Sequence, residues 1–313
     1  MKLKDLEKFR DNDGYIDISS LYNEPQYNSK IELVDADIYW KTGVTNSYSY
    51  LTELIIYELG KQMGLPVTKC HLAKCNGVVG VISESVVKRN EEQINYNKFL
   101  SQDIPAYYRT YNATVSILQL YDTLKRKVYY GSLSKENANE LLKLHVELLI
   151  FDEVVINSDR HAEGNLILVK DLQYKIKLRP IDNEMSLLSH FPTRKISEYL
   201  NSGKVEAIIK NEVMRTCGIL SIKSRVHSNN NYLLNLTETK HFFPNLFEES
   251  IKKAFSLDLV TAINNVEKQE KTVLPKEYKE WITFAFNERL ETIKEHFYDV
   301  DFIKPTQDDL EVN

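Results

Sequence analysis

The 313-residue sequence has little of what would place it in several classes of protein. Its three cysteines, Cys70, Cys75 and Cys217, are too few and too unevenly spaced for a disulfide framework, and no histidines accompany them at zinc-finger spacing. We interpret them as small core or surface residues. The sequence also lacks any apolar run near the roughly 18 residues of a membrane span, and it has no internal repeat or low-complexity domain.

Positive charge is not in excess either. The chain has 40 Lys and Arg against 45 Asp and Glu, which gives a formal net charge of −5 and a pI near 5.9. Such a balance provides no general basic field, so we expect direct contact with neither nucleic acid nor a membrane. The first residues contain no apolar segment of signal-peptide length. A cytoplasmic location is therefore expected, with secretion as an effector left open.

What the chain does contain is an ordinary globular composition, 42% hydrophobic and 27% charged, over a length that allows two lobes with their own cores. Residues 1–88 predict a small antiparallel sheet with one main helix. A hairpin is expected from 30–34 and 37–41, and the helix over 46–63. The Asn76-Gly77 dipeptide is typical of a tight turn between two further strands.

Residues 89–303 predict a mostly helical second lobe, and 304–313 a flexible acidic tail. The polar stretch 88–97 is interpreted as the linker or an insertion. His145 is expected to be a satisfied core or cleft residue, and His71 a surface side chain. The clearest helical periodicities cover 113–125, 138–155, 246–255, 257–267 and 275–298.

The most informative segment is Asn157-Ser-Asp-Arg-His-Ala-Glu-Gly-Asn165. It follows the long apolar helix and precedes two short β-like runs, after which comes Pro180-Ile-Asp182. Phosphoryl transfer from a nucleotide requires a carboxylate that accepts the proton of the attacking hydroxyl, together with a carboxamide and a second carboxylate that hold magnesium. Asp159, Asn165 and Asp182 fit these roles in that order, because a hairpin would fold Asp182 back beside the loop.

A lysine and an acid complete the pattern. Lys41 ends the second strand of the first hairpin, and Glu53 lies on the helix that follows. A kinase needs its phosphate-binding lysine held by an acid from a helix that packs on the sheet, and the strand-then-helix order of these two residues meets that requirement.

The motifs Asn-x-Asp-Arg-His with a nearby Asn165, then Pro-Ile-Asp182, resemble those of the HipA-like serine/threonine kinases, and within that family the short single-domain, CtkA-type members. The resemblance implies an α+β, two-lobed protein-kinase-like fold, with ATP and Mg²⁺ as cofactors. It further implies phosphorylation of protein Ser or Thr hydroxyls. Family members are often toxins or effectors limited by autophosphorylation, so an antitoxin or regulatory partner is also implied.

Four further residues are expected to support the loop. Asp152 needs a partner in its apolar surroundings, and the loop backbone or Arg160 would provide one. Arg160 is suited to hold a carboxylate or phosphate bidentately. Asn157 is expected to fix the turn, and His161, by the family pattern, to orient the loop rather than act as a base.

The nucleotide is expected to meet four more residues. Glu84 and Val86 lie where the chain would leave the first lobe, and backbone groups of such a connection usually meet the adenine edge. Ser29 and Lys30 follow a polar segment at the place of the phosphate-covering loop. A phosphate on Ser29 would compete with nucleotide phosphates for Lys30 or Lys41, which makes Ser29 a candidate autophosphorylation site.

Two departures from the family pattern leave alternatives open. Asn165 lies six residues after Asp159 rather than five, with Gly164 available to absorb the extra residue, and Glu184 stands where a glycine is common. A nucleotide-binding pseudokinase that acts as a regulatory module is therefore the main alternative. A lipid or small-molecule kinase could use the same loop, although no basic or amphipathic membrane face supports the lipid version.

Overall fold

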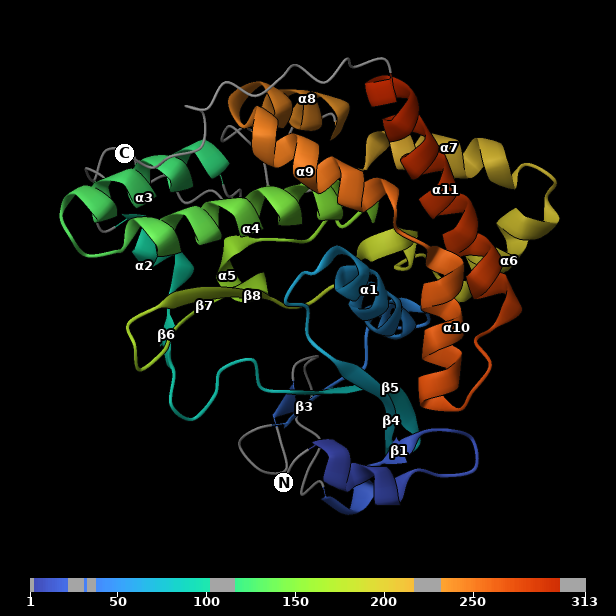
Figure 1. The fold of residues 1–313 in the computed structure, drawn as a ribbon. Coiled ribbons are helices and arrows are strands. Elements are labelled where there is room, and N and C mark those ends of the chain that lie inside the picture. Colours follow the sequence, from blue (N-terminus) through green and yellow to red (C-terminus); the bar gives the residue numbers. More distant parts are fainter. Residues whose placement is uncertain (1–2, 22–30, 33–37, 102–115, 217–231, 299–313) are drawn as a thin grey trace.

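The computed structural model describes residues 3–21, 31–32, 38–101, 116–216 and 232–298. These residues form a small N-terminal lobe built on a sheet and a larger, mostly helical C-terminal lobe (Figure 1). The α+β class that the sequence predicts is confirmed. The acidic tail expected at the end of the chain lies outside the described residues.

The sheet of the N-terminal lobe has five strands in the order β1-β4-β5-β3-β2. Pairing is antiparallel except between β1 and β4, which run parallel. A purely antiparallel start to the sheet was expected from the sequence, and the difference arises because the long connection between these two strands allows a parallel return. The strands are β1 (Ile16–Asp17), β2 (Ile31–Glu32), β3 (Ile38–Lys41), β4 (Cys70–Cys75) and β5 (Val78–Glu84).

Both expected hairpins are confirmed. In the first, Ile31 pairs with Trp40 across β2 and β3. In the second, Asn76 and Gly77 have φ angles of 50° and 79°, the two positive values that a tight two-residue turn between β4 and β5 requires. Gly80 on β5 is also required, because a Cβ there would collide with the carbonyl of Lys41 on the neighbouring strand.

Helix α1 (Ser49–Met63) packs between this sheet and the C-terminal lobe (Figure 1). It ends where expected, because Gly64 adopts a φ of 82° and the N–H of Leu65 then donates to the carbonyl of Gly60 at 2.9 Å. Most of its residues are buried, since one side covers β4 and β5 and another faces α10. The helix is therefore fixed by both lobes.

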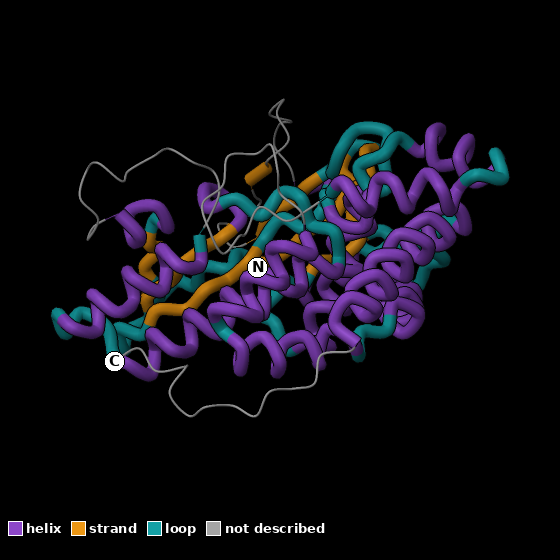
Figure 2. The backbone as a smooth tube through the Cα atoms, turned by 90° about the horizontal axis from the view of Figure 1, so that it is seen from above, coloured by secondary structure: helices purple, strands orange, loops and turns teal. Residues whose placement is uncertain are grey.

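The C-terminal lobe is organised around α4, which packs against α3, α8, α9 and α11 and whose second half is almost wholly buried (Figure 1). Seen from above in Figure 2, the strands form a diagonal band with most of the helices on one side of it. No helix among the described residues is long and apolar enough to cross a membrane. Among the described residues the helices of this lobe are α2 (Tyr96–Ser101), α3 (Ile117–Tyr129), α4 (Lys135–Val154), α5 (Ala162–Asn165), α6 (Thr193–Asn201), α7 (Val205–Arg215), α8 (Tyr232–Phe242), α9 (Pro244–Phe255), α10 (Leu259–Glu270) and α11 (Lys276–Tyr298). The 3-10 turns of the described chain are η1 (Leu3–Phe9) and η2 (Ser19–Leu21) near its start and η4 (Ser186–Leu188) in the C-terminal lobe.

A second sheet joins the lobes through the strands β6 (Glu92–Ile94), β7 (Leu166–Lys170) and β8 (Ile176–Pro180). The β7–β8 hairpin is the one that the sequence predicts. Strand β6 was expected to be linker, because its polar residues show no strand pattern. It forms because it is an edge strand that hydrogen-bonds to β7, and an exposed edge tolerates polar side chains.

Helix α10 of the C-terminal lobe contacts the N-terminal lobe at α1 and at β4. The carboxylate of Glu58 on α1 accepts hydrogen bonds from Asn265 at 3.1 Å and from Gln269 at 2.6 Å. At the end of α10, Glu270 contacts the Nδ1 atom of His71 at 2.8 Å. The expectation that His71 is a surface residue is therefore wrong, because this carboxylate from the other lobe covers it.

Candidate active site

The ammonium of Lys41 is the centre of an ionic cluster between the lobes. Its Nζ atom lies 3.0 Å from Oε1 of Glu53, in direct hydrogen-bond contact with Oδ1 of Asp182, and 3.1 Å from Oε2 of Glu184. Burial alone would lower the pKa of Lys41, but the three carboxylates outweigh it and raise the pKa above its ordinary value. The pairing of Lys41 with Glu53 is thus present, and Asp182 joins them.

Glu53 is held on its other side by the residue that follows Asp182. The backbone N–H of Asn183 donates to Oε1 of Glu53 at 3.0 Å, and its side-chain amide donates to Oε2 at 3.2 Å. The amide oxygen of Asn183 in turn accepts from Arg160 at 2.5 Å. Sequence reasoning missed Asn183. The available signal was a carboxamide directly after the predicted ligand Asp182, since an amide can donate to an acid and accept from an arginine.

Arg160 and Asp152 form the base of the loop. Two nitrogens of Arg160 donate to the two carboxylate oxygens of Asp152, each at 3.0 Å, and both side chains are fully buried. A third nitrogen of Arg160 donates to the carbonyl of Ile181 at 2.6 Å. The bidentate contact expected of Arg160 is confirmed, and its partner is the carboxylate that was predicted to need one.

Asn157 connects this base to the catalytic candidate. Its amide donates to Asp152 at 3.1 Å, and its side-chain oxygen accepts from the backbone N–H of Asp159 at 3.2 Å. His161 contacts Asp159 through Nδ1, at 3.0 Å from the carbonyl and 3.3 Å from the carboxylate. These contacts match the turn-fixing and loop-orienting roles predicted for Asn157 and His161. The side chain of Asp159 is 39% exposed, so it remains open to a second reactant.

Asn165 closes the loop from the far end. Its side-chain Nδ2 donates to the carbonyl of Asp159, and its own carbonyl accepts from the N–H of Ile181 at 3.0 Å. Gly164, at a φ of 109°, takes the unusual backbone conformation expected where the extra residue is absorbed. The spacing of six residues therefore still places Asn165 against Asp159.

These residues fit a magnesium site completed by phosphate oxygens. The buried Oδ1 atom of Asn165 has no hydrogen-bond partner among the described residues, and a buried polar atom without a partner is costly unless a ligand satisfies it. Within the described chain no group of three or more His, Cys, Asp and Glu side chains is arranged as a complete metal cage. A magnesium ion usually takes one or two protein ligands together with water and nucleotide phosphates. Asn165 and Asp182 would be those ligands.

The backbone after β8 sets the position of Asp182. Asp182 has a φ of 63°, a left-handed conformation that Asp tolerates better than most residues. The turn continues through Glu184, whose carbonyl accepts from Ser189 at 2.6 Å, and it is tied to the end of α4 where the N–H of Leu187 donates to Val155 at 2.8 Å. This tight path turns Asp182 and Glu184 toward Lys41.

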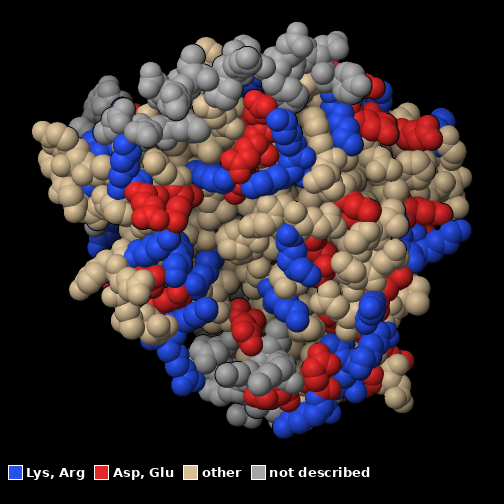
Figure 3. Space-filling view, in the orientation of Figure 1, with Lys and Arg blue, Asp and Glu red and all other residues tan. Residues whose placement is uncertain are grey.

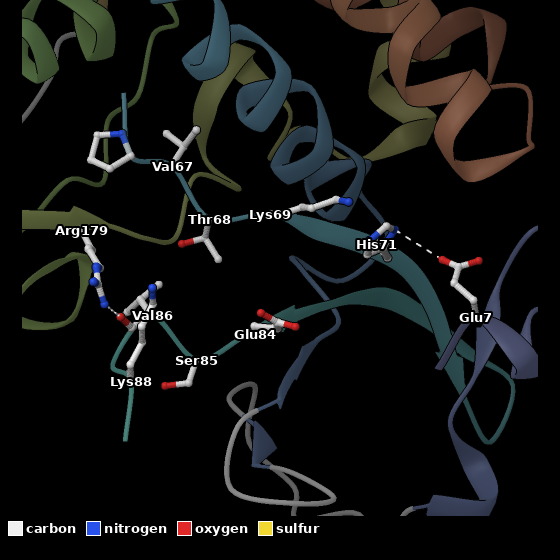
Figure 4. A pocket seen from close by; sticks show the side chains of 11 residues that line it. Glu7, Val67, Thr68, Lys69, His71, Glu84, Ser85, Val86, Lys88 and Arg179 are labelled. Carbon is white, nitrogen blue, oxygen red and sulfur yellow. Dashed lines mark hydrogen bonds and ion pairs between the residues drawn. The ribbon is translucent and has the colours of Figure 1, made fainter. Parts of the chain in front are cut away.

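Glu84 and Val86 lie at the connection between β5 and β6, as expected of a link between lobes. Their side chains help to line a cavity of about 580 Å³, together with Thr68 and Arg179 (Figure 4). In β5 the side chain of Glu84 points to the face of the sheet opposite Lys41, since Val81 is the residue that pairs with Lys41. None of Lys41, Glu53, Asp182 and Glu184 is among the residues that line the cavity, so the cavity is separate from the Lys41 cluster.

Two expected nucleotide contacts, Ser29 and Lys30, lie outside the described residues, so their predicted roles stay predictions. On the face shown in Figure 3, acidic and basic side chains are interspersed rather than gathered into a field of one sign.

A continuous series of hydrogen bonds thus runs from Lys41 through Glu53 and Asn183 to Arg160, and from there to the Asp159 loop. A sheet lobe with a lysine and a helix acid, over a helical lobe with an Asp loop and a second acid after a hairpin, defines the class of kinase-like folds.

Within that class, the structural neighbours are HipA-like kinases. The proinflammatory kinase CtkA of Helicobacter pylori superposes with a TM-score of 0.65 at 13% identity, covering 89% of this chain and 94% of that one. The HipA chain from a HipA, HipB and operator DNA complex of Shewanella oneidensis superposes with a TM-score of 0.51 at 12% identity, covering 82% of this chain and 57% of that one. No protein-family model and no curated sequence match the chain. At such identities the likeness establishes the fold.

Proposed function

We propose that the protein is an ATP- and Mg²⁺-dependent kinase that phosphorylates Ser or Thr hydroxyls of a protein, itself included. The observation that supports this most is the convergence of Lys41, Glu53 and Asp182 on one point, connected by hydrogen bonds to the loop that carries Asp159. Surface ion pairs are common, but a partly buried lysine shared by acids from a helix and from a hairpin end is not.

The chemistry follows from these positions. The oxygen of the acceptor hydroxyl attacks the γ-phosphorus, the bond to the bridging oxygen breaks, and ADP leaves. Asp159, with its exposed carboxylate, orients the hydroxyl and accepts its proton. Lys41 binds the phosphates, and Glu53 holds Lys41 in place. Bound magnesium neutralises charge that develops on the phosphate oxygens, and Asn165 and Asp182 are the residues that would hold it.

The partner and the biological role extend the same proposal. HipA of Shewanella oneidensis was solved with HipB, and CtkA of Helicobacter pylori is described as a proinflammatory kinase. By analogy we propose a toxin or effector kinase with a protein substrate, and an antitoxin or other regulatory partner. This step rests on likeness of fold alone.

Intact-mass measurement after incubation with ATP and magnesium tests the proposal. We expect added phosphate on the wild type or on a protein from a host extract. The variants Asp159→Asn and Asp182→Asn should lower the rate by about 10²–10⁴-fold, because each removes a group that acts in the transition state. The matched control is Glu140→Gln, which removes an exposed acid that pairs only with Lys175 among the described residues. Equal phosphate transfer by Asp159→Asn and the wild type would exclude the proposed role of Asp159.

A pseudokinase is the second candidate, and the Lys41 cluster gives it support, because three carboxylates already surround the cation that should bind phosphate. For a pseudokinase we expect ATP with magnesium to raise the melting temperature while the mass of every protein stays unchanged. A mass increase of one phosphate that depends on Asp159 would reject it.

A further inference from the structure

Glu184 is the least expected member of the Lys41 cluster. Its carboxylate lies 3.1 Å from the ammonium, and its side chain is only 17% exposed. Among the described residues the Glu184 carboxylate contacts no cation besides Lys41. The backbone fixes this approach, because the carbonyl of Glu184 accepts from Ser189 and the next turn is bonded to the end of α4. The contact therefore belongs to the fold and is not a chance surface pairing.

The three carboxylates of the cluster are not equivalent. Both oxygens of Glu53 accept hydrogen bonds from Asn183, so Glu53 remains held whether or not Lys41 stays beside it. Asp182 has a second use, because it is a fitting metal ligand. Glu184 has neither of these anchors, and its contact with Lys41 is the one that a competing anion would replace.

The charges of the cluster do not balance. One ammonium faces three carboxylates, so Glu184 converts a site with one surplus negative charge into a site with two. Free nucleoside triphosphate is a polyanion, and in a partly buried site the repulsion between like charges a few ångströms apart is only weakly screened. A nucleotide that arrives without cations would have to displace Glu184 from Lys41 and then lie beside it.

We infer that Glu184 is a specificity residue that competes with nucleotide phosphates for Lys41, so that the site accepts nucleotide only together with divalent cations. This inference rests on the proposed function, since it assigns the requirement to the same phosphate site. When the metal is bound, Asp182 would be available to hold it, and Lys41 would be available to the phosphates. The surplus charge of Glu184 then lies next to a neutralised triphosphate.

The test measures binding of a nonhydrolysable ATP analogue by calorimetry, with magnesium and with excess chelator. The wild type should bind the magnesium complex and bind the metal-free analogue at least 100-fold more weakly. Glu184→Gln, which keeps the shape and removes the charge, should tighten metal-free binding at least tenfold, or about 1.4 kcal/mol. It should change binding of the magnesium complex less than metal-free binding. Glu184→Asp retracts the carboxylate from Lys41 and should give a smaller gain.

The surface variant Glu140→Gln is the control for a general change of charge, and it should bind like the wild type. Metal-free affinity of Glu184→Gln within twofold of the wild type, with the magnesium complex still bound, would overturn the role of Glu184 alone. Failure of the wild type to bind the magnesium complex at all would overturn the proposed function as well. The two failures are therefore distinguishable in one set of titrations.

Discussion

Two ionic clusters lie close together in this protein and differ in kind. Around Arg160, one cation meets one carboxylate, and both carboxylate oxygens of Asp152 are bonded in a fully buried setting. Around Lys41, one cation meets three carboxylates, and the side chain of Lys41 is 20% exposed. The first cluster is balanced and closed. The second carries surplus negative charge and is open.

This difference distinguishes an ion pair that supports the structure from a cluster that can bind a ligand. A buried ion pair whose hydrogen bonds are all satisfied holds the backbone in one arrangement, but it has nothing left for a ligand. A cluster with surplus charge and partial exposure is poised to exchange partners, because a cation or an anion can replace one of its members. Asn183 connects the two, since it accepts from Arg160 and donates to Glu53. The closed cluster thereby holds the open one in place.

The largest effect is expected from breaking the closed cluster. Asp152→Ala leaves the guanidinium of Arg160 buried without its bidentate partner, which should lower the free energy of unfolding by about 3–5 kcal/mol. Urea titration followed by circular dichroism measures this loss. Glu140→Ala is the matched control, because its pair with Lys175 is exposed and should contribute less than about 1 kcal/mol. Similar losses for the two variants would contradict the distinction between closed and exposed pairs.

His145 is fully buried, as the Arg160 cluster is, but it is a neutral group. Burial lowers the pKa of His145 to about 4, although a hydrogen bond to the carbonyl of Leu141 opposes the shift. Its Nδ1 donates to that carbonyl and its Nε2 accepts from the hydroxyl of Tyr96 at 2.7 Å, so both partners suit the neutral ring. The sequence prediction of a satisfied core histidine is confirmed.

The pH dependence of stability follows from that shift. The unfolded chain binds the proton near the ordinary value of 6.5 and the folded protein only near 4, so stability is lost as the pH falls through this window. The loss attributable to His145 reaches about 3 kcal/mol at its lower end. In urea titrations, the free energy of unfolding of His145→Gln should change less between pH 6.5 and pH 4 than that of the wild type. His296→Gln, at an exposed position, should leave it as in the wild type. An unchanged curve in His145→Gln would contradict the assignment.

Local chemistry determined the parts of the fold and site that could be predicted. The order of strand and helix was enough to pair Lys41 with Glu53, and two backbone angles available to Asn76-Gly77 fixed a hairpin. Asp152 and Arg160 could be paired because an acid in apolar surroundings requires a partner.

The remainder depended on tertiary geometry. Strand β6 exists because β7 offers it an edge, which no pattern in its own residues reveals. His71 is covered by Glu270, which is 199 residues away in sequence. The contact of Glu184 with Lys41 depends on the left-handed turn at Asp182, and residue type alone gave no sign of that conformation.

The smallest expected effect has the opposite sign and comes from the open cluster. Burial raises the pKa of Glu184, with Asp182 and Glu53 adding to the shift and Lys41 opposing it. Because that pKa lies above the ordinary 4.5, ionising Glu184 costs more in the folded protein than in the unfolded chain. The wild type therefore loses stability as the pH rises from below 4.5 through the raised pKa of Glu184.

Glu184→Gln should escape that loss and be more stable than the wild type at neutral pH, by about 0.5–2 kcal/mol. Below pH 4.5 the two proteins should converge, because the wild-type carboxyl is then protonated. Urea titrations at pH 4 and pH 7 measure both points. If Glu184→Gln is less stable than the wild type at pH 7, the ion pair with Lys41 outweighs the repulsion among the acids. The two clusters would then be alike in kind, and the surplus charge would give no basis for assigning function to the open one.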